Sequence, residues 1–249
     1  MQTVIIGSGN VAYHMAKAFA QNGISLAQIF GRNETELQKI SSELNIPHST
    51  EKLEDADLYI ICVSDNSVED VSKTITKKNC LVAHTSGSLS KEILIGEYRK
   101  SSFYPLQTFS KTKDLDYTKI PFFIETENSE DQKILTDLAS KISENVMEST
   151  HEKRKYIHVT AVFACNFVNH LFARAKEISD AQEIPFDYFL PLINETVQKI
   201  GEIDPKSAQT GPAVRNDKRV LELHEQLLRD ESLEIYKTMN HSIKKMYEL

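Results

Sequence analysis

The first strand-like run of the chain ends in a glycine-rich turn, and this feature constrains the fold more than any other. Residues 2–6 read QTVII and residues 7–12 read GSGNVA, a G-x-G-x-x-A pattern. In such a pattern Gly7 permits the tight turn, Gly9 lets the backbone approach a pyrophosphate, and Ala12 lets a helix pack closely on the sheet. Glycines often simply end a strand, so the context decides. Here the pattern lies between a strand and a helix, which favours a dinucleotide-binding turn.

The first part of the chain alternates short apolar runs with amphipathic stretches. Strands are expected at residues 2–6, 26–30, 57–62, 80–84, 101–104, 121–125 and 144–148, and helices at 11–22, 34–44, 67–77 and 130–143. Strands that alternate with helices indicate parallel units with right-handed crossovers. The sequence therefore predicts an α/β fold with a doubly wound parallel sheet, the Rossmann arrangement, over residues 1–150.

The pattern changes near Thr150, after which no strand is expected. Helices are expected at 152–181, from Pro185 to about 200, at 216–229 and at 232–247. Residues 151–249 should therefore form a second, all-α domain for substrate binding or dimerisation. The middle of the long helix, residues 159–168, is apolar on nearly all sides, so we expect other helices or a second subunit to bury it.

Composition narrows the choice of partners and compartment. The formal net charge is -7 and no basic block stands out, which argues against nucleic acid and anionic membrane surfaces as partners. Three widely spaced cysteines provide neither a disulfide framework nor a zinc signature, and each is expected to be buried. No signal peptide is expected, and the 159–168 run is too short to span a bilayer. A cytoplasmic protein without a metal is the resulting expectation.

The end of the second strand bears on the choice of cofactor. NAD-binding domains usually carry Asp or Glu there, which accepts hydrogen bonds from the ribose 2′-OH. This chain has Arg32 instead, and the nearest acid, Glu34, starts the next helix. A guanidinium suits a 2′-phosphate, although a plain surface arginine is the alternative. The sequence thus favours NADP.

Small polar residues follow the third and fourth strands, where ligands of open α/β sheets bind. Helix capping explains such residues equally well. The predicted cofactor contacts are Gly7, Ser8, Gly9, Asn10, Val11, Gly31, Arg32, Asn33, Val63, Ser64 and Ser86. The predicted substrate contacts are Ser86, Gly87, Gln107, Asn166 and Arg215.

Four motifs together resemble a known family: GSGN at residues 7–10, HTSGS at 84–88, YPLQTF at 104–109 and QTGPAVRND at 209–217. They are similar to Rossmann-like NADP oxidoreductases whose helical C-terminal domain has no assigned function. That group looks related to pyrroline-5-carboxylate reductase, ketopantoate reductase, and the 3-hydroxyacid and 6-phosphogluconate dehydrogenases. The resemblance implies a helical dimerisation domain, hence a homodimer, and a cleft between the domains.

Candidates for the proton donor come from both halves of the chain. His158 and Asn166 lie on the long helix, and Asn166 is an amide in an apolar run that must find a partner if buried. The dehydrogenase relatives carry a catalytic Lys one turn before such an Asn, where this chain has Val162. His84 and Tyr104 are candidates from the sheet side.

The segment 209–217 has turn chemistry, with Asp217 placed to cap the next helix. Arg215 could bind a substrate carboxylate or pair with an internal acid. Two functions remain open at this point. One is reduction of a small, anionic carbonyl or imine compound by NADPH. The other is dinucleotide binding without turnover, as in a sensor or partner subunit.

Overall fold

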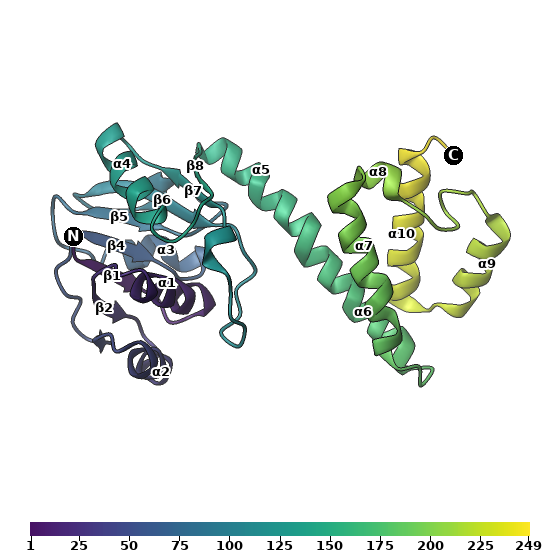
Figure 1. The fold of residues 1–249 in the computed structure, drawn as a ribbon, viewed down its shortest axis with the longest axis horizontal. Helices are drawn as coiled ribbons and strands as arrows, with labels where there is room; N and C mark the ends of the chain where they lie inside the picture. Colours follow the sequence, from purple (N-terminus) through teal and green to yellow (C-terminus); the bar gives the residue numbers. More distant parts are fainter. The chain divides into compact units, whose positions relative to one another are not determined.

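The computed structural model describes residues 1–249 and divides into two compact units, Met1–Asn166 and Phe167–Leu249. The first unit contains one eight-stranded sheet in the order β3-β2-β1-β4-β5-β6-β7-β8 (Figure 1). Its strands are β1 (Thr3–Ile6), β2 (Leu26–Phe30), β3 (His48–Ser49), β4 (Leu58–Ile61), β5 (Leu81–His84), β6 (Arg99–Pro105), β7 (Phe122–Glu125) and β8 (Val146–Glu148). The order reverses at β1, the expected Rossmann topology.

Strands β1 to β6 run parallel, whereas β7 pairs antiparallel with β6. The sequence predicted an entirely parallel sheet. The difference has a local cause, because residues 106–121 join the two strands with only a short 3₁₀ turn, Tyr117–Lys119, and no crossover helix. Without such a crossover the chain cannot return to the starting end of the sheet, so the next strand runs in the opposite direction.

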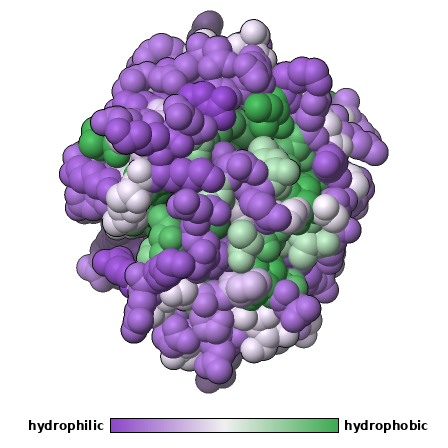
Figure 2. Space-filling model, turned by 90° about the vertical axis from the view of Figure 1, so that its left-hand side faces the viewer, coloured by the Kyte–Doolittle hydropathy of each residue, from purple (hydrophilic) through white to green (hydrophobic).

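Helices cover both faces of the sheet. Helices α1 (Asn10–Gln21), α2 (Glu34–Leu44) and α4 (Ser129–Ala139) pack over one core, which includes Phe19, Leu37 and Phe103. Helix α3 (Asp65–Ser72) and the 3₁₀ turn Lys91–Ile93 pack over the other, which includes Tyr59. The side of this unit drawn in Figure 2 is largely hydrophilic, with apolar groups between the hydrophilic ones toward its middle.

The division between the units lies later than residue 150, because helix α5 (His151–Ala161) is bound to the sheet. Arg154 of α5 is fully buried, and its guanidinium lies 2.6 Å from the Glu125 carboxylate and 2.5 Å from the Leu89 carbonyl oxygen. His151 bonds the carbonyl of Ser88 at 2.9 Å. The first turns of the long helix therefore complete the Rossmann unit.

The long helix runs from His151 to Asp180 and contains a π-helical segment, Val162–Phe167, between α5 and α6 (Val168–Asp180). By length and composition alone it could cross a membrane, a test that core helices of soluble proteins also pass. Its apolar middle is exposed in the single chain, as shown by Val159 at 45%. Cys165 is exposed in the single chain, so its predicted burial was wrong there, whereas Cys62 and Cys80 are buried; Asn166 is exposed as well.

The second unit is helical throughout, as predicted. It contains α6, a 3₁₀ turn Phe186–Phe189, α7 (Leu190–Glu202), α8 (Pro205–Ala208), α9 (Lys218–Leu227) and α10 (Asp230–Met246). Arg174 of α6 pairs with Glu231 of α10, and Asp217 caps α9 as its sequence position predicted. The short α8 was not predicted, because residues 205–208 are too few for a helical period to show.

Candidate functional site

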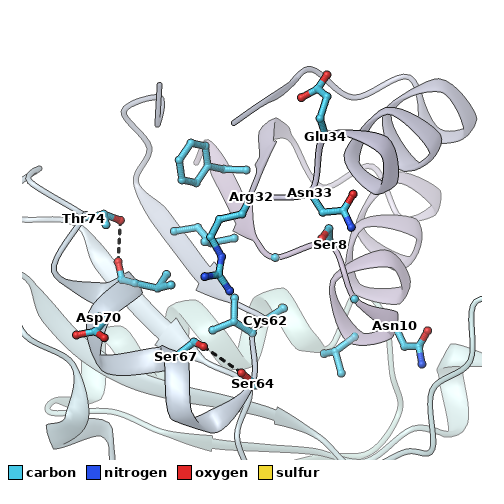
Figure 3. A pocket seen from close by; sticks show the side chains of 18 residues that line it. Ser8, Asn10, Arg32, Asn33, Glu34, Cys62, Ser64, Ser67, Asp70 and Thr74 are labelled. Carbon is cyan, nitrogen blue, oxygen red and sulfur yellow. Dashed lines mark hydrogen bonds between the residues drawn. The ribbon is translucent and has the colours of Figure 1, made fainter. Parts of the chain in front are cut away.

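A cavity of about 1230 Å³ opens at the carboxyl ends of β1, β2 and β4 (Figure 3). All the predicted cofactor contacts line it except Ser86. The predicted contacts did not include several further lining residues, which are Glu34 at the start of α2, Ser67 and Asp70 on α3, and Thr74 just after α3. Helical faces near a ligand carry no short motif, so nothing in their spacing distinguishes these residues from a solvated surface.

The two glycines of the turn serve different needs. Gly7 has φ +139°, and a Cβ there would lie 2.2 Å from the carbonyl oxygen of Cys62, so neither the backbone nor the packing admits a side chain. Gly9 has φ -81°, and a Cβ there would meet no atom within 4 Å. The protein's own packing therefore does not require glycine at position 9. A ligand that approaches the backbone through the cavity would require glycine there, because a Cβ would occupy its space.

Helix α1 presents an uncapped N-terminus to this cavity. Its N-cap is Gly9, no side chain bonds its first amides, and its first turn contains no acidic residue. Helix α2, by contrast, is capped by Asn33, which accepts from the Glu36 amide at 3.1 Å. Free N–H groups and the positive end of a helix dipole form an anion site. The first turn of α1 can therefore bind a pyrophosphate.

Arg32 lies at the end of β2 and points into the cavity, toward the turn formed by Ser64 and Ser67 (Figure 3). The structure shows no hydrogen bond or ion pair to its guanidinium. The neighbouring acid Glu34 points away and bonds His48 at 2.9 Å. Because the Arg32 guanidinium is unpaired and the Glu34 carboxylate points elsewhere, this end of the cavity favours a negatively charged group rather than a neutral ribose hydroxyl.

Lys111 is a second cation beside the glycine-rich turn, and no sequence pattern predicted it. Its ammonium donates to the carbonyl of Ser8 at 2.7 Å and to the Glu36 carboxylate at 2.5 Å. Hydrogen bonds from Lys111 and Lys39 lower the pKa of Glu36 to about 2. Lys111 lies about a hundred residues from the turn in sequence, so only the fold brings it to the glycine-rich backbone.

A second group of polar side chains lies at the same edge of the sheet, near the carboxyl ends of β5 and β6. The Tyr104 hydroxyl lies 3.0 Å from Nδ1 of His158. Their rings meet edge to face, with 5.9 Å between centroids. A Cβ on Gly87 would lie 2.7 Å from His158 Nδ1 and 2.8 Å from Tyr104 Cζ, so the backbone at Gly87 packs directly against the pair. Burial raises the pKa of Tyr104 to about 12, which keeps its hydroxyl protonated at neutral pH.

His84 and Ser86 shape the loop after β5. His84 is fully buried, and burial lowers its pKa to about 3, so its ring is neutral. Its Nδ1 accepts from the Ser86 amide at 3.2 Å. The Ser86 hydroxyl in turn accepts from the amides of Ser88 and Leu89, each at 3.1 Å. Both predicted site residues thus hold the loop against which His158 packs.

The remaining predicted substrate contacts are dispersed along the chain. Gln107 is exposed after β6, and its amide oxygen accepts from the Thr108 backbone at 2.7 Å. Asn166 is exposed in the π-helical segment, and Arg215 is exposed in the second unit without an ion pair. No group of three or more His, Cys, Asp or Glu side chains is placed to hold a metal ion.

The fold and the cavity are those of a Rossmann-type dinucleotide-binding protein. Comparison with family models agrees, since residues 2–87 match the family described as NADP oxidoreductase, coenzyme F420-dependent, and residues 120–243 match a domain of unknown function. A candidate NADP oxidoreductase from Bacteroides fragilis is 36% identical, with 100% of this chain and 98% of that chain covered and a TM-score of 0.92. The chain belongs to this family of NADP oxidoreductases.

More distant structures share the fold. A reductive aminase from Aspergillus terreus, in complex with NADPH and ethyl-5-oxohexanoate, has a TM-score of 0.73 at 11% identity, with 98% of this chain and 94% of that chain covered. A 1-pyrroline-5-carboxylate reductase from Streptococcus pyogenes has a TM-score of 0.65 at 15% identity, with 100% and 99% covered. The search of curated proteins returned no match.

Proposed function

We propose that this chain reduces a small, anionic carbonyl or imine compound with NADPH. The observation that carries the proposal is the cavity at the glycine-rich turn, where Gly9 leaves room that the protein does not fill and α1 offers uncapped amides. Bound there, the dinucleotide would place its pyrophosphate at the first turn of α1.

The preference for NADP over NAD follows from Arg32. Its guanidinium lines the cavity without an acidic partner, and Glu34, the acid nearest to it in sequence, is engaged by His48. Arg32 would therefore bind the 2′-phosphate of the adenosine ribose.

The substrate class is supported by the similar proteins and by the sequence. A reductive aminase and a pyrroline-5-carboxylate reductase share the fold. Val162 stands where the hydroxyacid dehydrogenase relatives carry a catalytic Lys, which favours an imine or a proton donor from elsewhere in the chain. Asn166, Gln107 and the unpaired Arg215 remain our proposed substrate contacts, and Arg215 would bind the anionic group.

We also propose that the protein is a cytoplasmic homodimer. Large apolar side chains on the long helix and α7 are exposed in the single chain, including Tyr156 at 71%, Leu192 at 65% and Val197 at 57%. A second copy that packs along these helices would bury them. Three widely spaced cysteines without a CxxC pair are typical of a reducing compartment. Light scattering at micromolar concentration should give twice the chain mass.

The test of the proposed function has two parts. Titration with NADPH and with NADH, followed by nucleotide fluorescence, should show binding of both, with NADPH bound more tightly. NADPH oxidation is then followed with a panel of 2-oxo acids and cyclic imines. Consumption of NADPH with at least one compound supports the reductase. Firm binding without any turnover would favour a dinucleotide-binding protein instead, and a failure to bind either nucleotide would refute both.

A further inference from the structure

The Tyr104–His158 pair lies at the edge of the sheet where ligands of this fold bind. Strands β4, β5 and β6 run parallel, so the residues that follow them meet at the same edge as the glycine-rich turn. Gly87 follows β5, and Tyr104 lies near the carboxyl end of β6. Because the pair and the cavity share this edge, one extended ligand can reach both.

The cavity indicates which half of a dinucleotide would approach the pair. Arg32 follows β2, on one side of the glycine-rich turn, and marks the adenosine half. A dinucleotide lies across the point where the strand order reverses, so its nicotinamide half extends past β4 toward β5. Asp65, which follows β4, is close enough to Tyr104 to contribute, after burial, to the raised pKa of the tyrosine. The pair thus borders the side on which the nicotinamide should lie.

Four features suit His158 to proton transfer. The side chain is neither fully buried nor free, since it is partly exposed and held through Nδ1 by the Tyr104 hydroxyl at 3.0 Å. Nε2 has no bond in the structure and is available to a ligand. A hydroxyl can donate or accept, so the bond to Tyr104 persists whether the imidazole is neutral or charged. Histidine is also the side chain best suited to exchange protons near neutral pH.

We propose that His158 donates the proton that completes the reduction, and that Tyr104 is the positioning residue that aims it. This inference rests on the proposed function. NADPH, when bound, supplies a hydride to the carbon of a C=O or C=N bond and becomes NADP⁺. The electron pair of that bond moves to the oxygen or nitrogen, which takes a proton from Nε2 of the His158 imidazolium. The neutral imidazole keeps its Nδ1 proton on the Tyr104 oxygen and regains the other from solvent.

Other charged groups lie around the pair. Asp65 at the start of α3 and the buried Arg154 on α5 both act on Tyr104, and Arg154 is itself paired with Glu125. His151 on α5 lies near His84 and bonds the loop after β5. The imidazolium of His158 is the donor, so reduction should slow as pH rises, and loss of the Tyr104 hydroxyl, its acceptor, should move that decline to lower pH.

The first experiment locates the pair relative to the cofactor without any substrate. The ring signals of histidine-labelled protein are followed by NMR, with His158 assigned by its loss in His158→Gln. Two probes are compared: NADP⁺, and adenosine 2′,5′-bisphosphate, which lacks the nicotinamide half. We expect both to bind and only NADP⁺ to shift or broaden the His158 signals.

The outcomes separate the inference from the proposed function. If both probes bind and neither moves His158, or both move it equally, the inference is wrong while the cofactor assignment stands. If neither binds, the proposed function fails and the inference fails with it. If only NADP⁺ moves His158, the pair borders the nicotinamide half as proposed.

The second experiment measures the chemistry with whichever compound of the panel is reduced. His158→Gln should lower kcat on the order of 100-fold. Tyr104→Phe should lower kcat about tenfold and move the pH profile to lower pH, with KM and the Kd for NADPH near wild type. Tyr98→Phe is the matched control, since it removes a buried hydroxyl bonded at 3.1 Å to the Ser72 carbonyl. An unchanged kcat and pH profile in Tyr104→Phe would overturn the positioning role. Absence of turnover with every compound counts against the proposed function, and the NMR result then decides whether the Tyr104–His158 pair borders the nicotinamide half.

Discussion

Arg32→Ala should weaken NADPH binding far more than NADH binding. The guanidinium lines the cavity with no acid to satisfy it, so binding a 2′-phosphate breaks no ion pair within the protein. A hydrogen bond to a charged group is worth about 1.5–3 kcal/mol, and exposure of Arg32 to solvent places the contact near the lower figure. Since about 1.4 kcal/mol is a factor of ten, the Kd for NADPH should rise about tenfold. The Kd for NADH should change less than about twofold.

The assay is a fluorescence titration of each nucleotide at low and at moderate salt. Screening weakens an exposed charge contact, so the difference between wild type and Arg32→Ala should shrink as salt is added. Arg219→Ala is the control, because Arg219 is an exposed arginine of α9 that does not line the cavity, and its removal changes the net charge equally. Equal losses for NADPH and NADH would refute the assignment of Arg32 to the 2′-phosphate.

Three further predictions concern the framework of the site. Gly7→Ala should destabilise the fold by several kcal/mol in urea unfolding, since its Cβ would overlap a carbonyl oxygen, whereas Gly9→Ala should keep wild-type stability and lose NADPH affinity. The reverse pattern would contradict the roles given to the two glycines. Arg154→Met should cost about 3 kcal/mol in the same assay, because it leaves a carboxylate without its buried partner, and a loss below about 1 kcal/mol would show that the pair does little to hold α5 on the sheet. Burial lowers the pKa of His84 from 6.5 in the unfolded chain to about 3 in the folded protein, so wild type should lose stability as pH falls below 6.5, by about 2 kcal/mol at pH 5. His84→Asn should lose less stability over the same range, and parallel pH curves for the two proteins would disprove this.

The sequence predicted those parts of the fold that depend on local patterns. The strand at residues 26–30 was predicted to the residue, and the long helix to within one residue at each end. Most residues of the cavity wall could be predicted because a glycine-rich turn must follow a strand and precede a helix, a constraint contained in adjacent residues. The antiparallel β7 was missed, since strand direction depends on the connection from β6 rather than on the strand's own residues.

The substrate side could not be predicted in the same way. His158 was a candidate, but its partner Tyr104 lies 54 residues away in sequence. No sequence pattern predicts that a residue at the end of β6 will contact a residue on α5, because several elements separate them. Asn166 looked buried because its neighbours are apolar. In the single chain that apolar run is exposed. An apolar run indicates that some surface buries it, but the sequence does not show whether this surface belongs to the same chain or to another. Lys111 had no local signal at all.

Three glycines near the candidate site occupy similar places in the sequence pattern and meet different physical demands. Gly7 is required by the backbone and by the carbonyl of Cys62. Gly87 is required by two side chains, because a Cβ would displace Tyr104 and His158 from each other. Gly9 is required by nothing within the protein. A glycine that neither conformation nor packing explains, at the uncapped start of a helix and on the wall of a cavity, indicates that its missing side chain makes room for a bound molecule.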